Sequence, residues 1–222
     1  MDGILGLLDE GRTYMLSPEG TPAAQQQMVV NTLSWLMTPV LPPFYRIFMS
    51  GIVPCRENGD PDWLVDGFAK LVSVLPENIQ SKLAPGTQLG PWFYAPALTS
   101  FVTPTFFGFL VGPSTINRRE DGQLGGLVVE KCKFLQESSC KGMCLNICKL
   151  PAQSFFTEGL GLPLSVNPNF ETQECQWSFG QTPLPPSEDP LWPNGCVTGC
   201  PTRSIVKEMG RAGDQAEYSG CE

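Results

Sequence analysis

The stretch that decides how this chain folds reads Cys132-Lys-Phe-Leu-Gln-Glu-Ser-Ser-Cys140-Lys-Gly-Met-Cys144-Leu-Asn-Ile-Cys148. Its last three cysteines are spaced by four residues, so on a regular helix they share one face and rise about 6 Å per step. Neighbouring thiols at this spacing could grip one metal ion or cluster. Cys140 and Cys148 lie about 12 Å apart on the same arithmetic and could not both reach a single zinc ion. Either the helix breaks near Gly142 or the ligands serve two sites.

The chain has nine cysteines and no histidine. Thiolates select zinc, copper(I) or iron–sulfur clusters. The lack of histidine excludes histidine-ligated haem and any Ser/His or Cys/His nucleophile pair. The pattern therefore predicts a metal centre held by sulfur, with disulfides or plain buried thiols as the other interpretations. The predicted metal ligands are Cys132, Cys140, Cys144, Cys148, Cys175, Cys196 and Cys200.

A second motif, Cys196-Val-Thr-Gly-Cys200-Pro201, favours iron over zinc. A cysteine followed directly by proline is common at iron–sulfur ligation points, although ferredoxins space such ligands by two residues rather than three. Seven clustered thiols also exceed the four that one tetrahedral zinc requires. We therefore expect iron, as one or two iron–sulfur clusters, and keep zinc as the alternative.

Length, charge and composition bound the remaining possibilities. A chain of 222 residues suits one domain, or one domain plus an appendage. A net charge of −8 argues against a nucleic-acid partner, because that affinity rests on clustered Lys and Arg. The first 20 residues resemble neither a secretion signal nor an organelle transit peptide, so any transit segment is absent from this numbering.

Periodicity predicts an α+β chain that is mainly helical, with a helical amino-terminal half and a Cys-rich metal-binding module of short helices, a small β-hairpin and long loops. We expect residues 1–20 to be weakly ordered and Asp60-Pro61 to start a helix that ends before Pro76. The other predicted helices are 24–37, 44–52, 127–135, 140–149 (halted by Pro151) and 153–158, and the predicted hairpin strands are 164–166 and 176–179. The predicted divisions are 1–82 helical, 83–117 uncharged and aromatic, 118–203 Cys-rich, and 204–222 a polar tail.

Residues 83–117 contain no charged side chain and are dense in aromatics. Pro91, Pro96 and Pro104 recur inside this window and disfavour a transmembrane helix, which needs roughly 20 apolar residues. The first interpretation is a pair of short buried helices. The alternative is a surface that meets lipid, pigment or an apolar protein partner.

The run from Cys132 to Phe156 closely resembles a plastid family, the iron-containing beta-carotene isomerases of strigolactone biosynthesis known as the dwarf-twenty-seven proteins. The resemblance covers roughly residues 118–202. It continues through Gly161-Leu-Pro163-Leu, Asn167-Pro-Asn169-Phe170-Glu171, Cys175-Gln, Phe179-Gly180, Pro185-Pro186, Asp189-Pro190 and Cys196…Cys200-Pro201. The chain departs from the family pattern at Gln136 and Thr172, where carboxylates are expected, and at Ala152, where a threonine is expected.

This resemblance implies a chloroplast protein, in the stroma or associated with thylakoids, that isomerises a carotenoid double bond between trans and cis. Iron would assist by one-electron transfer or Lewis-acid contact, and an apolar groove would fix which bond rotates. The candidate residues for binding the carotenoid or other apolar pigment are Phe155, Phe156, Phe170 and Trp177. Two other functions stay open: a non-catalytic linker or scaffold bound to a photosynthetic (photosystem–antenna) complex of the thylakoid membrane through residues 83–117, and an iron–sulfur electron-transfer module.

Overall fold

The computed structural model describes residues 2–37 and 41–191. Its helices are α1 Asp2–Leu16, α2 Pro22–Leu36, α3 Leu41–Tyr45, η1 Arg46–Ser50, η2 Arg56–Asn58, α4 Asp62–Ser73, α5 Glu77–Gln80, η3 Ser81–Leu83, α6 Ala95–Val111, α7 Lys133–Ser138, α8 Lys141–Met143, η4 Cys144–Lys149, α9 Leu150–Ser154 and η5 Phe155–Gly159. Its strands are β1 Ser114–Arg118, β2 Leu124–Val129, β3 Leu164–Pro168 and β4 Cys175–Phe179. The predicted α+β class, mainly helical, is confirmed. The predicted polar tail and the Cys196–Cys200 motif lie outside the described residues.

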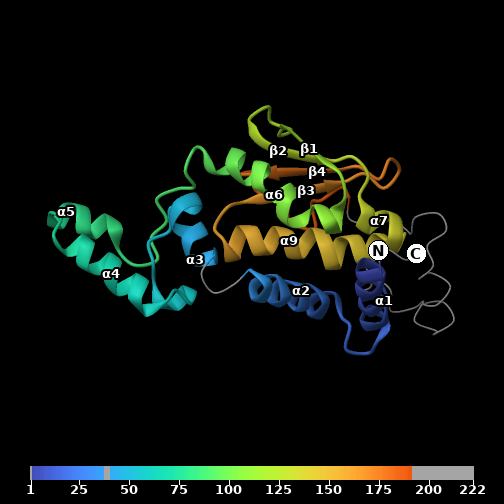
Figure 1. The fold of residues 1–222 in the computed structure, drawn as a ribbon, viewed down its shortest axis with the longest axis horizontal. Coiled ribbons are helices and arrows are strands. Elements are labelled where there is room, and N and C mark those ends of the chain that lie inside the picture. Colours follow the sequence, from blue (N-terminus) through green and yellow to red (C-terminus); the bar gives the residue numbers. More distant parts are fainter. Residues whose placement is uncertain (1, 38–40, 192–222) are drawn as a thin grey trace.

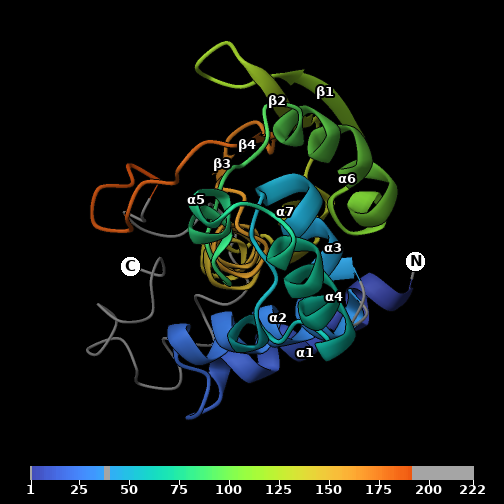
Figure 2. The ribbon, with the colours of Figure 1, turned by 90° about the vertical axis from the view of Figure 1, so that its left-hand side faces the viewer.

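A four-stranded antiparallel sheet, in the order β1-β2-β4-β3, forms one layer of the molecule. The second layer is a continuous helical stretch, here called the central helix, that runs through α8, η4, α9 and η5 from Lys141 to Gly159. Figure 1 shows it between the sheet and α2, while α4 and α5 project from one end of the molecule. Helix α6 packs against β1, β2 and β4. Seen along the long axis, α1 and α2 lie on one side of the central helix and the sheet and α6 on the other (Figure 2).

The hairpin predicted between 164–166 and 176–179 is confirmed as β3 and β4, with Val166 paired to Trp177. The prediction of a helix over 127–135 is wrong, because Leu124–Val129 forms the central strand β2 and only Lys133–Ser138 is helical. Residues 125–129 of β2 are mostly buried, so this apolar run has no period that separates it from a helix. Gly126 fits here because a Cβ atom would lie 2.4 Å from Asn117 Oδ1.

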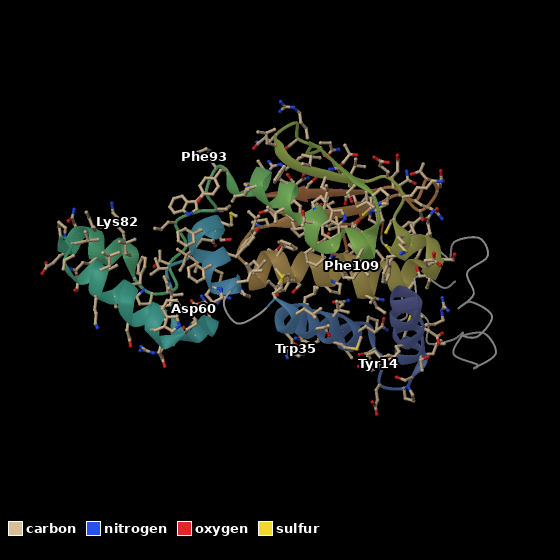
Figure 3. All side chains as sticks on the ribbon, in the orientation of Figure 1. Tyr14, Trp35, Asp60, Lys82, Phe93 and Phe109 are labelled. Atoms are coloured by element: carbon tan, nitrogen blue, oxygen red, sulfur yellow. The ribbon has the colours of Figure 1, made fainter. Side chains whose placement is uncertain are left out.

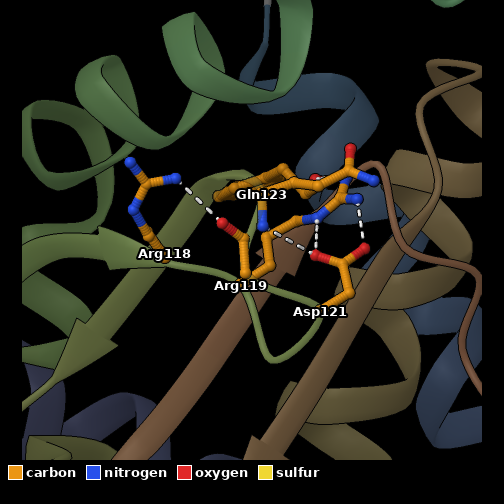
Figure 4. A network of polar contacts seen from close by, with 6 residues as sticks. Arg118, Arg119, Asp121 and Gln123 are labelled. Atoms are coloured by element: carbon orange, nitrogen blue, oxygen red, sulfur yellow. Dashed lines mark hydrogen bonds and ion pairs between the residues drawn. The ribbon is translucent and has the colours of Figure 1, made fainter.

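The turn between β1 and β2 is held by charges (Figure 4). Arg119 is buried and pairs with Asp121, while its Nη1 donates to the carbonyl oxygen of Phe179 at 3.0 Å. Asp121 Oδ1 also accepts from the backbone N–H of Gln123 at 3.1 Å. These bonds, with Arg119 first among them, hold the pKa of Asp121 below its ordinary value. One guanidinium thus ties the β1–β2 hairpin to the end of β4.

Two predictions about the amino-terminal half are wrong. Residues 1–20 are not weakly ordered, because α1 buries Leu8 and Met15 in the core and Arg12 Nη2 donates to Ser138 O at 3.3 Å. Asp60 does not cap α4. Its buried carboxylate pairs with Arg46 and accepts from the Cys55 N–H at 3.0 Å, which leaves Pro61 at the cap. The helix predicted over 24–37 is confirmed as α2. The helix predicted over 44–52 is confirmed up to Ser50, where η1 ends, and Gly51 is left-handed.

The window over 83–117 holds one long helix, α6, rather than a pair of short buried helices. Its aromatic side chains are not all buried, since Phe101 and Phe109 are 66% and 74% exposed. Among the described residues, no helix has the length and apolarity needed to cross a membrane.

Candidate functional site

The central helix carries Cys144 and Cys148. It continues past Pro151, where the sequence predicted that the helix would stop. Pro151 has no N–H to donate, and the helix passes it between two wider π-helical segments, η4 and η5. Inside this helix Cys144 is buried, as are Leu145 and Lys149. The predicted break near Gly142 is absent, since that residue is helical within α8.

Four thiols gather where the central helix meets the sheet. They are Cys132, at the amino-terminal cap of α7, Cys144 and Cys148 on η4, and Cys175, the first residue of β4. Cys132, Cys148 and Cys175 each disfavour the ionisation of Cys144, and Cys132 also disfavours that of Cys148 and Cys175. The four thiols come from three separate elements of the chain. We call these four residues the thiol cluster.

Burial keeps the thiol cluster protonated. Desolvation raises the pKa of Cys148 to about 12 and, with mutual repulsion second, raises the pKa of Cys144 and Cys175 well above the ordinary value. Burial also raises the pKa of Cys132, although backbone N–H groups of Leu135 and Phe134 oppose it. None of the described cysteines of this cluster forms a disulfide. In the metal-free chain at neutral pH, these four cysteines are therefore neutral thiols.

A positive charge that acts on the thiol cluster is that of Lys149, whose side chain is only 1% exposed. Its ammonium group pairs with the carboxylate of Asp189, itself almost fully buried. Lys149 lowers the pKa of Cys144 and Cys175, though by less than burial raises it. The ion pair also fastens the segment after β4 to the central helix, and this segment leads toward Cys196.

An apolar cavity of about 50 Å³ adjoins the thiol cluster. Cys148 forms part of its wall, together with Val29 and Leu33 of α2 and Ala152 of the central helix. The aromatic and bulky aliphatic walls come from α6, α7, the central helix and β4 and include Phe107, Phe134, Ile147, Phe156 and Trp177. Trp177 also hydrogen-bonds the Cys175 thiol. The cavity and the thiols therefore form one site.

The four predicted pigment-binding residues divide between two places. Phe156 and Trp177 line the cavity. Phe155 is buried and packs edge-on against Phe156, with ring centroids 5.6 Å apart. Phe170 lies elsewhere, partly buried beneath the ammonium group of Lys141 at 5.0 Å from its ring centroid. Their role in binding pigment stays a prediction.

The predicted ligand set divides as well. Cys140 is buried at the start of α8, whereas Cys196 and Cys200 lie outside the described residues. The thiol cluster suits iron by its chemistry, because soft sulfur ligands from several segments are what iron–sulfur centres use. Within residues 2–37 and 41–191, however, no three Cys, Asp or Glu side chains lie in positions that could hold a metal ion. The donor type fits iron, and the described geometry does not form a finished site.

Sequence reasoning missed the contributions of Lys149 and of the amino-terminal half. The signal for Lys149 was present, since a lysine directly follows Cys148 within the helix predicted over 140–149. Val29 and Leu33 lie in the helix predicted over 24–37, but nothing in the pattern indicated what that helix packs against. Gln136 and Thr172, two of the departures from the family pattern, are exposed. They lie outside the buried thiol cluster.

The fold and site define a class of protein: a thiol-rich α+β domain with an apolar cavity against its cysteines. Residues 109–188 match the family described as beta-carotene isomerase D27-like, C-terminal. The predicted resemblance to this family is thereby confirmed over that part of the chain.

Two curated relatives match a little under half of the chain. The chain is 39% identical over 101 residues to a protein of Medicago truncatula named "Beta-carotene isomerase D27, chloroplastic", covering 44% of this chain and 40% of that protein. It is 39% identical over 106 residues to an Arabidopsis thaliana protein of the same name, covering 46% and 40%. The match thus spans about two fifths of the length of these relatives. No solved structure matches the chain.

Proposed function

We propose that this chain is a plastid carotenoid isomerase that rotates a double bond of a beta-carotene-like polyene between trans and cis. The observation that carries the proposal is the 39% identity, over 101 and 106 residues, to two proteins named beta-carotene isomerases; residues 109–188, which include most of the site, also match the D27-like family. Both relatives are named chloroplastic, which supports the same location for this chain. The linker and electron-transfer alternatives have no comparable support.

The chain's own contribution is an apolar, water-excluding wall beside buried thiols. A polyene has no polar group to anchor, so binding rests on apolar area and on shape. Phe156, Trp177 and Cys148 line the same cavity, which supports the two aromatic side chains as the residues that fix the polyene. Binding pockets of this kind hold roughly 300–1,000 Å³, far more than the present cavity. The walls from α2 and α6 must therefore move apart when a carotenoid enters.

We further propose that iron is held by the thiol cluster, with Cys140, Cys196 and Cys200 as the other candidate ligands. When bound, iron would supply transient one-electron or Lewis-acid chemistry that lowers the order of the double bond. Binding requires the thiols to lose their protons, so iron affinity falls as pH is lowered. Whether the iron is one cluster or two, or is replaced by zinc, is decided by metal and acid-labile sulfide content per chain.

The test uses the full chain purified without oxygen, supplied with iron, an electron source and either all-trans or cis beta-carotene. We expect the isomers to interconvert, as followed by chromatography. Cys148→Ser should lose both iron and activity, because it removes a thiol from the cavity wall. Cys55→Ser is the matched control, since Cys55 is a buried thiol outside the cluster. Iron-loaded wild-type protein that never interconverts the isomers would contradict the proposal.

A further inference from the structure

Helix α6 exposes an apolar stripe on the side away from the sheet. Leu98, Phe101 and Phe109 are 40%, 66% and 74% exposed, and their spacing of three and eight residues places them on one helix face. Phe93, just before the helix, is 95% exposed. Figure 3 labels Phe93 and Phe109 near the two ends of this helix. We call these four residues the aromatic stripe.

The segment that carries the aromatic stripe has no charge. Residues 83–117 lack any Asp, Glu, Lys or Arg, whereas the whole chain carries a net charge of −8. The polar groups of the two aromatic residues next to Phe93 are bonded internally. The Trp92 indole donates to Ile47 O at 3.1 Å, and the Tyr94 hydroxyl donates to the backbone carbonyl of Phe48.

Such a surface can enter hydrocarbon without leaving these polar groups unpaired, which is the main cost of placing protein in lipid. Trp and Tyr beside exposed Phe are also the side chains favoured at the boundary of a bilayer. A protein partner fits less well, because protein interfaces use about one hydrogen bond per 100–200 Å² and the polar groups of Trp92 and Tyr94 are already bonded within the chain.

We propose that the aromatic stripe binds the surface of a lipid bilayer whose headgroups carry no net charge. Helices that bind anionic membranes carry Lys and Arg on their polar face, and this segment has none. The acidic chain is instead repelled by anionic lipid.

The stripe lies on the opposite side of α6 from the cavity, whose wall includes Phe107, Leu110 and Val111. One helix therefore separates the bilayer from the site. Because carotenoids dissolve in hydrocarbon, docking here would let the substrate pass from the bilayer to the thiol cluster. This last step rests on the proposed function, whereas bilayer binding does not.

The test is flotation of the full chain with vesicles that contain no carotenoid. We expect binding to phosphatidylcholine vesicles that persists in high salt, and weaker binding when phosphatidylglycerol is added. Phe101→Glu and Phe109→Glu should each reduce the partition coefficient about tenfold or more. Trp35→Glu on α2 is the matched control, since Trp35 is 82% exposed yet lies on the other side of the molecule (Figure 3). Circular dichroism checks that each variant folds.

Two results would overturn the proposal. One is the absence of flotation by wild-type protein, or an equal loss in Trp35→Glu. The other is self-association in sedimentation that Phe101→Glu abolishes while vesicles bind nothing, which would assign the stripe to a second copy of the chain. An inactive protein that still floats would refute the proposed isomerase function and leave bilayer binding intact.

Discussion

Helix α6 and the central helix are both long, both contain an internal proline, and they lie in opposite surroundings. The central helix is buried between the sheet and α2 and still carries Lys149 and thiols inside it. Helix α6 has no charge yet exposes Phe101 and Phe109. Hydropathy alone would assign their positions the other way round. Burial in this molecule follows from whether polar groups find partners, because an uncharged helix can lie outside and a lysine can lie inside when paired.

The strongest test of this comparison is to unpair the buried lysine. Lys149→Met leaves Asp189 as a buried carboxylate without its partner, and we expect a loss of about 3–5 kcal/mol in the free energy of unfolding. The double variant Lys149→Met/Asp189→Leu should recover most of that loss, because two apolar groups can replace a buried ion pair. Urea unfolding of the full chain measures both. If the single and double variants lost the same unfolding free energy, pairing with Asp189 would not be the reason that Lys149 can be buried.

Matched phenylalanines in the core and on α6 sharpen the same contrast. Phe179 is fully buried and packs edge-on against Phe156, with ring centroids 5.2 Å apart. We expect Phe179→Ala to cost about 3–5 kcal/mol of unfolding free energy. Phe109→Ala should change it by about 0.5 kcal/mol or less, because its ring is mostly in solvent. A large loss from Phe109→Ala would mean that the aromatic stripe is part of the folding core.

Sequence reasoning predicted well where local pattern decides, and failed where tertiary pairing does. The β3–β4 hairpin was predicted from alternation, and α2 from its stripe. Part of Leu124–Val129 was predicted to be helical. Most of this strand is buried, so its apolar residues do not alternate with polar ones. The helix stop at Pro151 was wrong, because packing on both sides holds the central helix together through the proline. The division of the chain at residues 82, 117 and 203 stays a prediction.

For the site, the residue types in the sequence were informative, whereas the spacing of those residues did not predict how they are arranged in space. The cysteine pattern indicated convergence, and the structure brings four thiols from three segments together. Spacing could not reveal that Val29 and Leu33 close the cavity from α2. Such contacts depend on which helix covers which face, and that information is not local in the sequence.

Alkaline pH should destabilise the metal-free chain through the thiol cluster. The folded pKa of Cys148 is about 12, and those of Cys144 and Cys175 are also raised, whereas in the unfolded chain each thiol returns to its ordinary value near 9. The folded chain thus holds more protons above pH 9. Stability is complete below that pH and falls by about 1.4 kcal/mol per pH unit for each such thiol as pH rises. Urea midpoints between pH 7 and pH 10.5 measure the slope. Cys148→Ala should make it shallower, and an unchanged slope would contradict the assigned pKa.

The smallest expected change in unfolding free energy concerns the contact between the uncharged helix α6 and α3. The Tyr45 hydroxyl shares a hydrogen bond of 2.7 Å with the hydroxyl of Thr99, joining α3 to the inner side of α6. Burial raises the pKa of Tyr45 above its ordinary value, so the phenol stays protonated there. Tyr45→Phe should cost about 1 kcal/mol of unfolding free energy, since one neutral hydrogen bond is lost and Thr99 keeps part of its bonding. Thr99→Val should cost a similar amount, and the double variant should cost less than the sum of the two. Strict additivity in this cycle would mean that the two hydroxyls do not act on each other, and that apolar packing alone positions the inner face of α6.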